Sequence, residues 1–264
     1  MVADPKKILR KAVAAMALVL SATGVASASE SGILSARAQR SFDHGKFAKG
    51  HGQLERALLA SRKEANLLAE GRVLIGMAQI RTLSLDFPMA DSILSVVRQE
   101  SLDKNTKVQF AKARVALDIA QGKYRDAVNL CKAINEDMLK KADETTQAAF
   151  YGECAVALSS VNQTGAAKDF LNMAGKRSNK KGGFYTYTAA RMADHQGKDE
   201  ADSLYRGAEQ KSIEGNKPYI TASILYYRSQ LRTTSAEEKK DLKIRCKNSF
   251  ELMGLPNNAK RCAE

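Results

Sequence analysis

The sequence has little proline and lacks the residue patterns that mark most catalytic and metal sites. Four prolines in 264 residues, together with 44% apolar residues, argue against a disordered chain. There is no Cys-x-x-Cys pair and no Cys/His cluster with zinc spacing. There is also no Gly-x-Ser-x-Gly, His-Glu-x-x-His, P-loop or Gly-x-Gly-x-x-Gly pattern. We therefore expect a folded protein that is not an enzyme and uses neither a metal nor a cofactor.

The N-terminal apolar run is too short to span a membrane. This run, Ala12–Leu20, is rich in alanine and falls well short of the roughly 20 apolar residues that a spanning helix needs. Basic residues precede it, and Ala26, Ser27 and Ala28 follow with small side chains where a signal peptidase reads the chain. We predict a signal peptide over residues 1–28 and export to the periplasm or the extracellular space. The alternative is an uncleaved membrane anchor.

Acidic residues are outnumbered, and the formal net charge is +13. The positive charge gathers in two clusters, Lys176, Arg177, Lys180 and Lys181, and then Lys239, Lys240 and Lys243. A basic surface attracts polyanions and anionic membranes. One reading is therefore a surface that binds an anionic cell-wall polymer or lipid headgroups, and the other is solvated loops and helix faces. Export argues against nucleic acid as the partner.

No β-type alternation competes with helical periodicity in this chain, and the clearest helical unit is Thr106–Asp137. Its apolar residues recur at intervals of three and four before and after Gly122, which is the spacing of one face of a helix. Glycine commonly ends a helix, so Gly122 divides the unit into two helices, the second beginning near Arg125. The sequence therefore predicts an all-α protein containing helical hairpins.

The unit resembles the tetratricopeptide repeat. Glycine and then an aromatic residue stand at its turn, and Ala127 stands where that family needs a small residue at the helix crossing. Looser copies place Gly50, Ala90, Ala167 and Ala201 at the equivalent position, with spacings of 34 to 40 residues. The resemblance implies a right-handed α-solenoid of about five to six antiparallel hairpins. It would occupy residues 29–216, and residues 217–264 would form C-terminal capping helices and a tail.

Four cysteines allow three pairings, and an even number in an exported chain favours disulfides. In the repeat frame Cys131 and Cys154 belong to adjacent units, so we predict that they pair. Cys246 and Cys262 then pair by elimination and tie the tail to the last helix. The alternative is that the cysteines are buried thiols.

Tyrosine is concentrated in two segments that the resemblance makes first helices, which line the concave groove of such arrays. If these helices are neighbours, their side chains form an aromatic and cationic strip suited to an extended peptide, although such aromatics are more often core residues. The residues of this strip are Tyr185, Tyr187, Arg191, Tyr226, Tyr227 and Arg228. We therefore expect an envelope scaffold or adaptor that binds a protein or peptide in its groove.

Overall fold

The computed structural model describes residues 29–180 and 182–264, and within these ranges the chain is helical and contains no strand. The predicted signal peptide, residues 1–28, lies outside the described residues. The α-helices are α2 (Glu30–Asp43), α3 (Phe47–Lys63), α4 (Leu67–Leu83), α5 (Phe87–Ser95), α6 (Lys104–Ala120), α7 (Tyr124–Ala133), α8 (Glu136–Lys140), α9 (Glu144–Ser160), α10 (Thr164–Arg177), α11 (Gly183–His195), α12 (Ala201–Glu214), α13 (Pro218–Gln230), α14 (Ala236–Leu252) and α15 (Pro256–Ala263). A short 3₁₀ helix, η1 (Gln99–Ser101), precedes α6. The all-α prediction is confirmed.

Local sequence sets where these helices begin and end. Asp103 and Asp143 cap the N-termini of α6 and α9, because each carboxylate accepts a hydrogen bond from a backbone amide of the first turn. Gly122 has a φ of +74° and lies in the turn between α6 and α7, as the sequence predicted. Pro88 lies in the first turn of α5, where a missing backbone amide costs no helical hydrogen bond.

Neighbouring helices pack closely because small residues lie where they cross. Gly50 in α3 lies against Phe42 in α2, and a Cβ built on this glycine would stand 2.5 Å from the phenyl ring. Ala90, Ala127 and Ala167 are fully buried. The small residues of the predicted repeat are therefore helix-contact positions.

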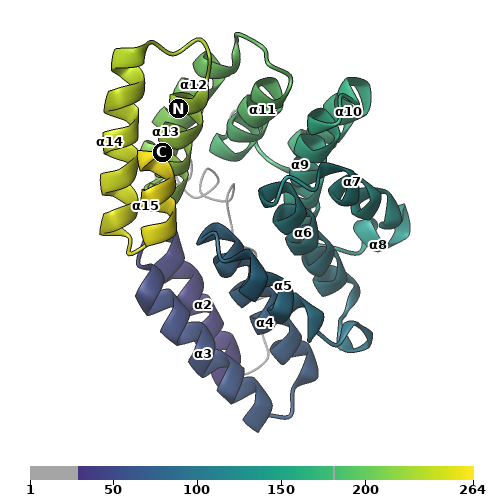
Figure 1. The fold of residues 1–264 in the computed structure, drawn as a ribbon. Coiled ribbons are helices and arrows are strands. Elements are labelled where there is room, and N and C mark those ends of the chain that lie inside the picture. Colours follow the sequence, from purple (N-terminus) through teal and green to yellow (C-terminus); the bar gives the residue numbers. More distant parts are fainter. Residues whose placement is uncertain (1–28, 181) are drawn as a thin grey trace, which may run out of the picture.

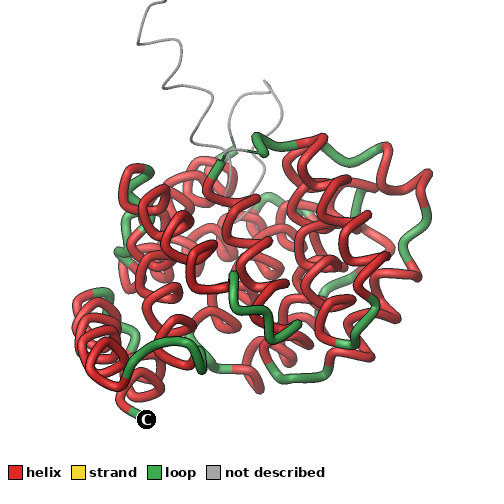
Figure 2. The backbone as a smooth tube through the Cα atoms, turned by 90° about the horizontal axis from the view of Figure 1, so that it is seen from above, coloured by secondary structure: helices red, strands yellow, loops and turns green. Residues whose placement is uncertain are grey.

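The helices form two layers around the centre of the molecule (Figures 1 and 2). In the inner layer α4 packs on α6, α6 on α9, and α9 on α11. The helices α5, α7, α10 and α12 each pack on the inner helix that precedes them in the chain. One face of the inner layer therefore contacts the outer helices, and the other faces the interior of the array.

The first and last described helices meet, which the sequence did not predict. Figure 1 shows α14 and α15 beside α2 and α3. A single apolar core contains Leu34 and Phe42 from the first helices and Leu242 and Phe250 from α14. The helix α14 packs on α13 and α15, and Met253 after it reaches the turn between α2 and α3, where a Cβ on Gly45 would stand 3.0 Å from its side chain.

The cysteines form the predicted pairs. Cys131 in α7 is bonded to Cys154 in α9, with Cα atoms 5.7 Å apart. Cys246 in α14 is bonded to Cys262 in α15, with Cα atoms 5.9 Å apart. The predicted tail is thus a helix held on α14. Both pairs fit an oxidising environment. None of the helices in the described ranges is long and apolar enough to cross a membrane.

Candidate ligand-binding cavity

A cavity of about 450 Å³ lies inside the helical array. Its volume is within the range of about 300–1,000 Å³ that proteins use for ligand sites. Residues from α4, α6, α9, α11 and α13 form most of the wall, and α15 adds Arg261. Phe42 and Asp43 of α2 also line it, so the cavity depends on both the first and the last described helices.

Tyrosines from α11 and α13 form an aromatic section of this wall. The ring centroids of Tyr187 and Tyr227 are 6.5 Å apart, and those of Tyr226 and Tyr227 are 5.5 Å apart. Behind them the buried Tyr205 ring stacks on Tyr227 at 5.8 Å. Burial raises the pKa of Tyr187 well above its ordinary value, so its hydroxyl is neutral at physiological pH. Packing behind the wall fixes these rings, which makes the surface preformed.

Two cationic groups in the wall have carboxylate partners. Arg191 Nη1 in α11 is 3.2 Å from Glu153 Oε2 in α9, and its guanidinium also lies 5.7 Å from the centroid of Tyr187. Lys217 Nζ, just before α13, is 3.0 Å from Asp43 Oδ2 at the end of α2. These ion pairs link neighbouring parts of the wall and use both of the carboxylates that line the cavity.

His195 lies at the end of α11 beside Arg191 and makes an edge contact with Tyr124, their ring centroids being 5.3 Å apart. Desolvation and then the charge of Arg191 lower the pKa of His195 to about 4. The imidazole is therefore neutral at physiological pH. It adds a planar group to the wall without adding charge.

Three other cations in the wall have no carboxylate within salt-bridge distance among the described residues: Lys112, Arg177 and Arg261. Arg177 donates to the Gln147 side chain and to the Met173 carbonyl, and it lies 4.8 Å from the Tyr151 ring centroid. The Arg261 guanidinium lies 4.0 Å from the Tyr226 ring centroid. The cavity therefore carries an excess of positive charge.

Two buried donor atoms at this wall have no acceptor within the described part of the chain: Nε2 of Gln79 in α4 and Nε of Arg261 in α15. Gln79 is only 7% exposed. Desolvation lowers the pKa of Lys112 in α6, and the more distant charge of Glu153 partly offsets this effect. Buried polar atoms are normally hydrogen-bonded, so both donors call for an explanation. Among the described residues, three further unpartnered atoms, Gln39 Oε1, Arg81 Nε and Asn258 Oδ1, belong to residues outside the cavity lining.

The structure brings together four of the six residues predicted to bind a partner. Tyr187, Arg191, Tyr226 and Tyr227 all line the cavity. Tyr185 does not, because its ring packs against Gly175 in α10.

Arg228 also fails to line the predicted strip, because it faces α12 and α14 rather than the cavity. Its side chain is almost fully buried and forms ion pairs of 2.7 to 2.9 Å with Asp202, Glu209 and Glu238. Arg228 was predicted to join the strip because it follows Tyr227 in the sequence. Adjacent side chains of a helix point in directions about 100° apart, so Arg228 faces away from the cavity when Tyr227 faces into it. Its charge therefore holds three helices together.

The predicted anionic-binding clusters do not form one surface. Lys176 and Lys180 are exposed near the end of α10, where Arg177 turns into the cavity, and Lys181 lies outside the described residues. The second cluster, Lys239, Lys240 and Lys243, lies on α14. Figure 1 shows α10 and α14 at opposite sides of the molecule. Acidic residues are interleaved with the lysines of α14, so its charge is mixed.

Sequence reasoning missed Gln79, Lys112, Glu153 and Arg261. A signal was present for Glu153, which interrupts the largely apolar helix α9. Lys112 gave none, because α6 also carries Lys104, Lys107 and Arg114. Arg261 gave no such signal, because its segment was interpreted as a tail.

The cavity offers hydrogen-bond donors, cations and aromatic faces. Within the described ranges, no group of three or more His, Cys, Asp or Glu side chains is placed to hold a metal ion. No protein-family model matches the chain, and no curated protein matches it either.

Proposed function

We propose that this protein is an exported binding protein that holds a segment of a partner protein in the cavity inside its helical array. In this proposal residues 1–28 are a cleaved signal peptide and the protein acts as a scaffold or adaptor in the periplasm or outside the cell. We further propose that the array is a right-handed solenoid of about five to six hairpins, similar to tetratricopeptide repeats. The paired cysteines and the small residues at the helix crossings support this reading.

One observation carries the proposed function: aromatic rings and guanidinium groups share the cavity wall. Tyr187, Tyr226 and Tyr227 lie beside Arg191 and Arg261 in that wall. Tyr and Arg dominate the energetics of protein interfaces because they combine large contact area with hydrogen bonding. Rigid side chains also lose little entropy on binding, which favours affinity.

We also propose that the role is binding rather than catalysis. Glu153 and Asp43 are engaged by Arg191 and Lys217 respectively. A general base must be free to accept a proton and poised near the working pH. The arrangement therefore supports recognition of a ligand more than chemistry on it.

The test is affinity capture from the native envelope fraction with the oxidised full-length protein as bait. The double variant Y187A/Y226A removes two rings from the wall, and Y185A serves as the matched control because Tyr185 packs between α10 and α11. We expect the double variant to lose most of the partner and Y185A to retain it. Equal recovery by all three proteins would rule out the cavity as the binding site.

A further inference from the structure

Among the described residues, the buried atoms that lack a partner at the cavity wall are both nitrogen donors. Gln79 Nε2 and Arg261 Nε are buried donors with no acceptor in the described part of the chain. The ammonium of Lys112 and the guanidinium of Arg177 add charge, and neither has a carboxylate of the described residues within salt-bridge distance. An apolar ligand would leave all of these donors unsatisfied, and a cationic ligand would be repelled.

The donors are also spread over the wall instead of meeting at one point. Gln79 is on α4, Lys112 on α6, Arg177 at the end of α10 and Arg261 on α15. Figure 1 shows α15 on the opposite side of the array from α6 and α10. A compact anion such as phosphate needs several donors around one position. Separated donors with aromatic surface between them instead suit a chain that carries separated negative groups.

From this placement we infer that the segment held in the cavity is an acidic peptide whose carboxylates are bound by Lys112, Arg261, Arg177 and Gln79. This inference rests on the proposed function and specifies the chemistry of its partner. The apolar parts of the peptide pack on the tyrosine rings, and Arg191 stays bound to Glu153. The cation–π contact of Arg261 with Tyr226 holds the guanidinium at the wall before the ligand arrives.

Three matched libraries of blocked hexapeptides test the inference by calorimetric titration into the oxidised full-length protein. They differ at two fixed positions, which hold Glu, Gln or Lys, so that backbone and length are constant. We expect the Glu library to bind at least about tenfold more tightly than the Gln library, with affinity falling as salt rises. The Lys library should bind least.

The variant K112M tests whether the carboxylates of the peptide are bound by a cation inside the cavity. Its matched control is K240M, which removes the same charge from an exposed position on α14. We expect K112M to weaken binding of the Glu library about tenfold, to leave the Gln library unchanged and to raise the melting temperature. Because this substitution removes an unpaired charge from a confined site, loss of binding cannot be attributed to loss of folding.

The possible outcomes separate the inference from the proposed function. Equal binding of the Glu and Gln libraries overturns the acidic preference and leaves peptide binding standing. No binding by any library overturns both. If inorganic phosphate binds in a Lys112-dependent way and the peptides do not, the ligand is a phosphate group and the acidic-peptide inference is wrong.

Discussion

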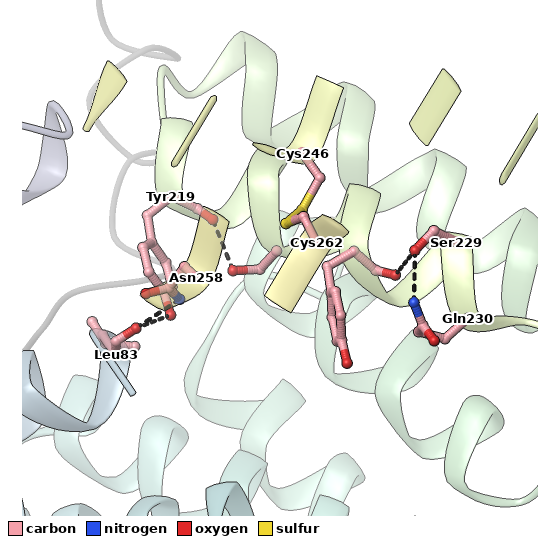
Figure 3. Close-up of a disulfide and its surroundings, with 9 residues drawn as sticks. Leu83, Tyr219, Ser229, Gln230, Cys246, Asn258 and Cys262 are labelled. Atoms are coloured by element: carbon pink, nitrogen blue, oxygen red, sulfur yellow. Dashed lines mark hydrogen bonds between the residues drawn. A yellow bond between two sulfur atoms is a disulfide. The ribbon is translucent and has the colours of Figure 1, made fainter. Parts of the chain in front are cut away.

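The hydroxyl of Tyr219 donates a 2.9 Å hydrogen bond to the main-chain carbonyl of Leu83, which is 136 positions away in the sequence. Asn258 donates to the same carbonyl at 3.0 Å, so α13 and α15 both bind the C-terminal end of α4 (Figure 3). A main-chain carbonyl has two lone pairs and can accept both bonds. This junction joins α13 and α15 to α4, and all three helices contribute to the cavity wall.

Removing the hydroxyl of Tyr219 tests the contribution of this junction. Y219F keeps the ring against Phe47 and Phe250 and deletes one hydrogen bond. We expect unfolding free energy to fall by about 1 kcal/mol, because Asn258 still satisfies the carbonyl. Hydrogen exchange should rise in α13 and α15 more than in α9. An even rise over all helices would contradict a local role at the junction.

The two disulfides should have similar effects on stability and different effects on the cavity. The bonded cysteines are 16 positions apart in Cys246–Cys262 and 23 positions apart in Cys131–Cys154. Because the two loops are similar in length, removal of either disulfide should lower the free energy of unfolding by roughly 3 kcal/mol. Only the C246S/C262S variant should free α15, which carries Asn258 and Arg261. We expect that variant to lose peptide affinity and C131S/C154S to keep it. Chemical denaturation and calorimetric titration measure the two effects.

The buried charge of Arg228 makes a sharp stability prediction. Its guanidinium binds Glu209 at 2.8 Å and Asp202 at 2.9 Å, and the side chain is only 3% exposed. Asp202 keeps Arg206 and Glu209 keeps Arg245 as second partners. R228M should therefore lower the free energy of unfolding by about 1–3 kcal/mol, the cost of removing one buried hydrogen-bonding partner. The exposed ion pair of Arg232 with Asp199 is the control, and R232M should cost less than about 1 kcal/mol.

The pKa of His195 predicts how stability depends on pH. It is lowered to about 4 in the folded protein, and an unfolded histidine titrates near 6.5. Between these two pKa values His195 binds more protons in the unfolded chain than in the folded one. Its contribution to the free energy of unfolding is therefore full above about pH 6.5 and is lost as the pH falls towards 4. H195Q should remove this part of the pH dependence. An NMR titration that gives His195 a pKa near 6.5 would refute the prediction.

The sequence by itself determined the all-α class and the turn at Gly122, and within the predicted repeat frame it indicated the cysteine pairs. Gly122, Pro88 and the spacing of apolar residues act through the nearest turns of the chain, so their effects can be read from neighbouring positions. The pairing of Cys131 with Cys154 followed from adjacent units packing together. Tyr187, Arg191, Tyr226 and Tyr227 were found because they lie on helices expected to face the groove.

Only the tertiary structure decided that the array closes and which side chains face its interior. Closure depends on small rotations between successive helices that accumulate over the whole chain, and no local pattern records their sum. The closed arrangement turned Arg228 into a buried ion-pair centre and brought Arg261 from a predicted tail into the cavity wall. It also joined α13 to the end of α4 through the hydrogen bond from Tyr219 to Leu83.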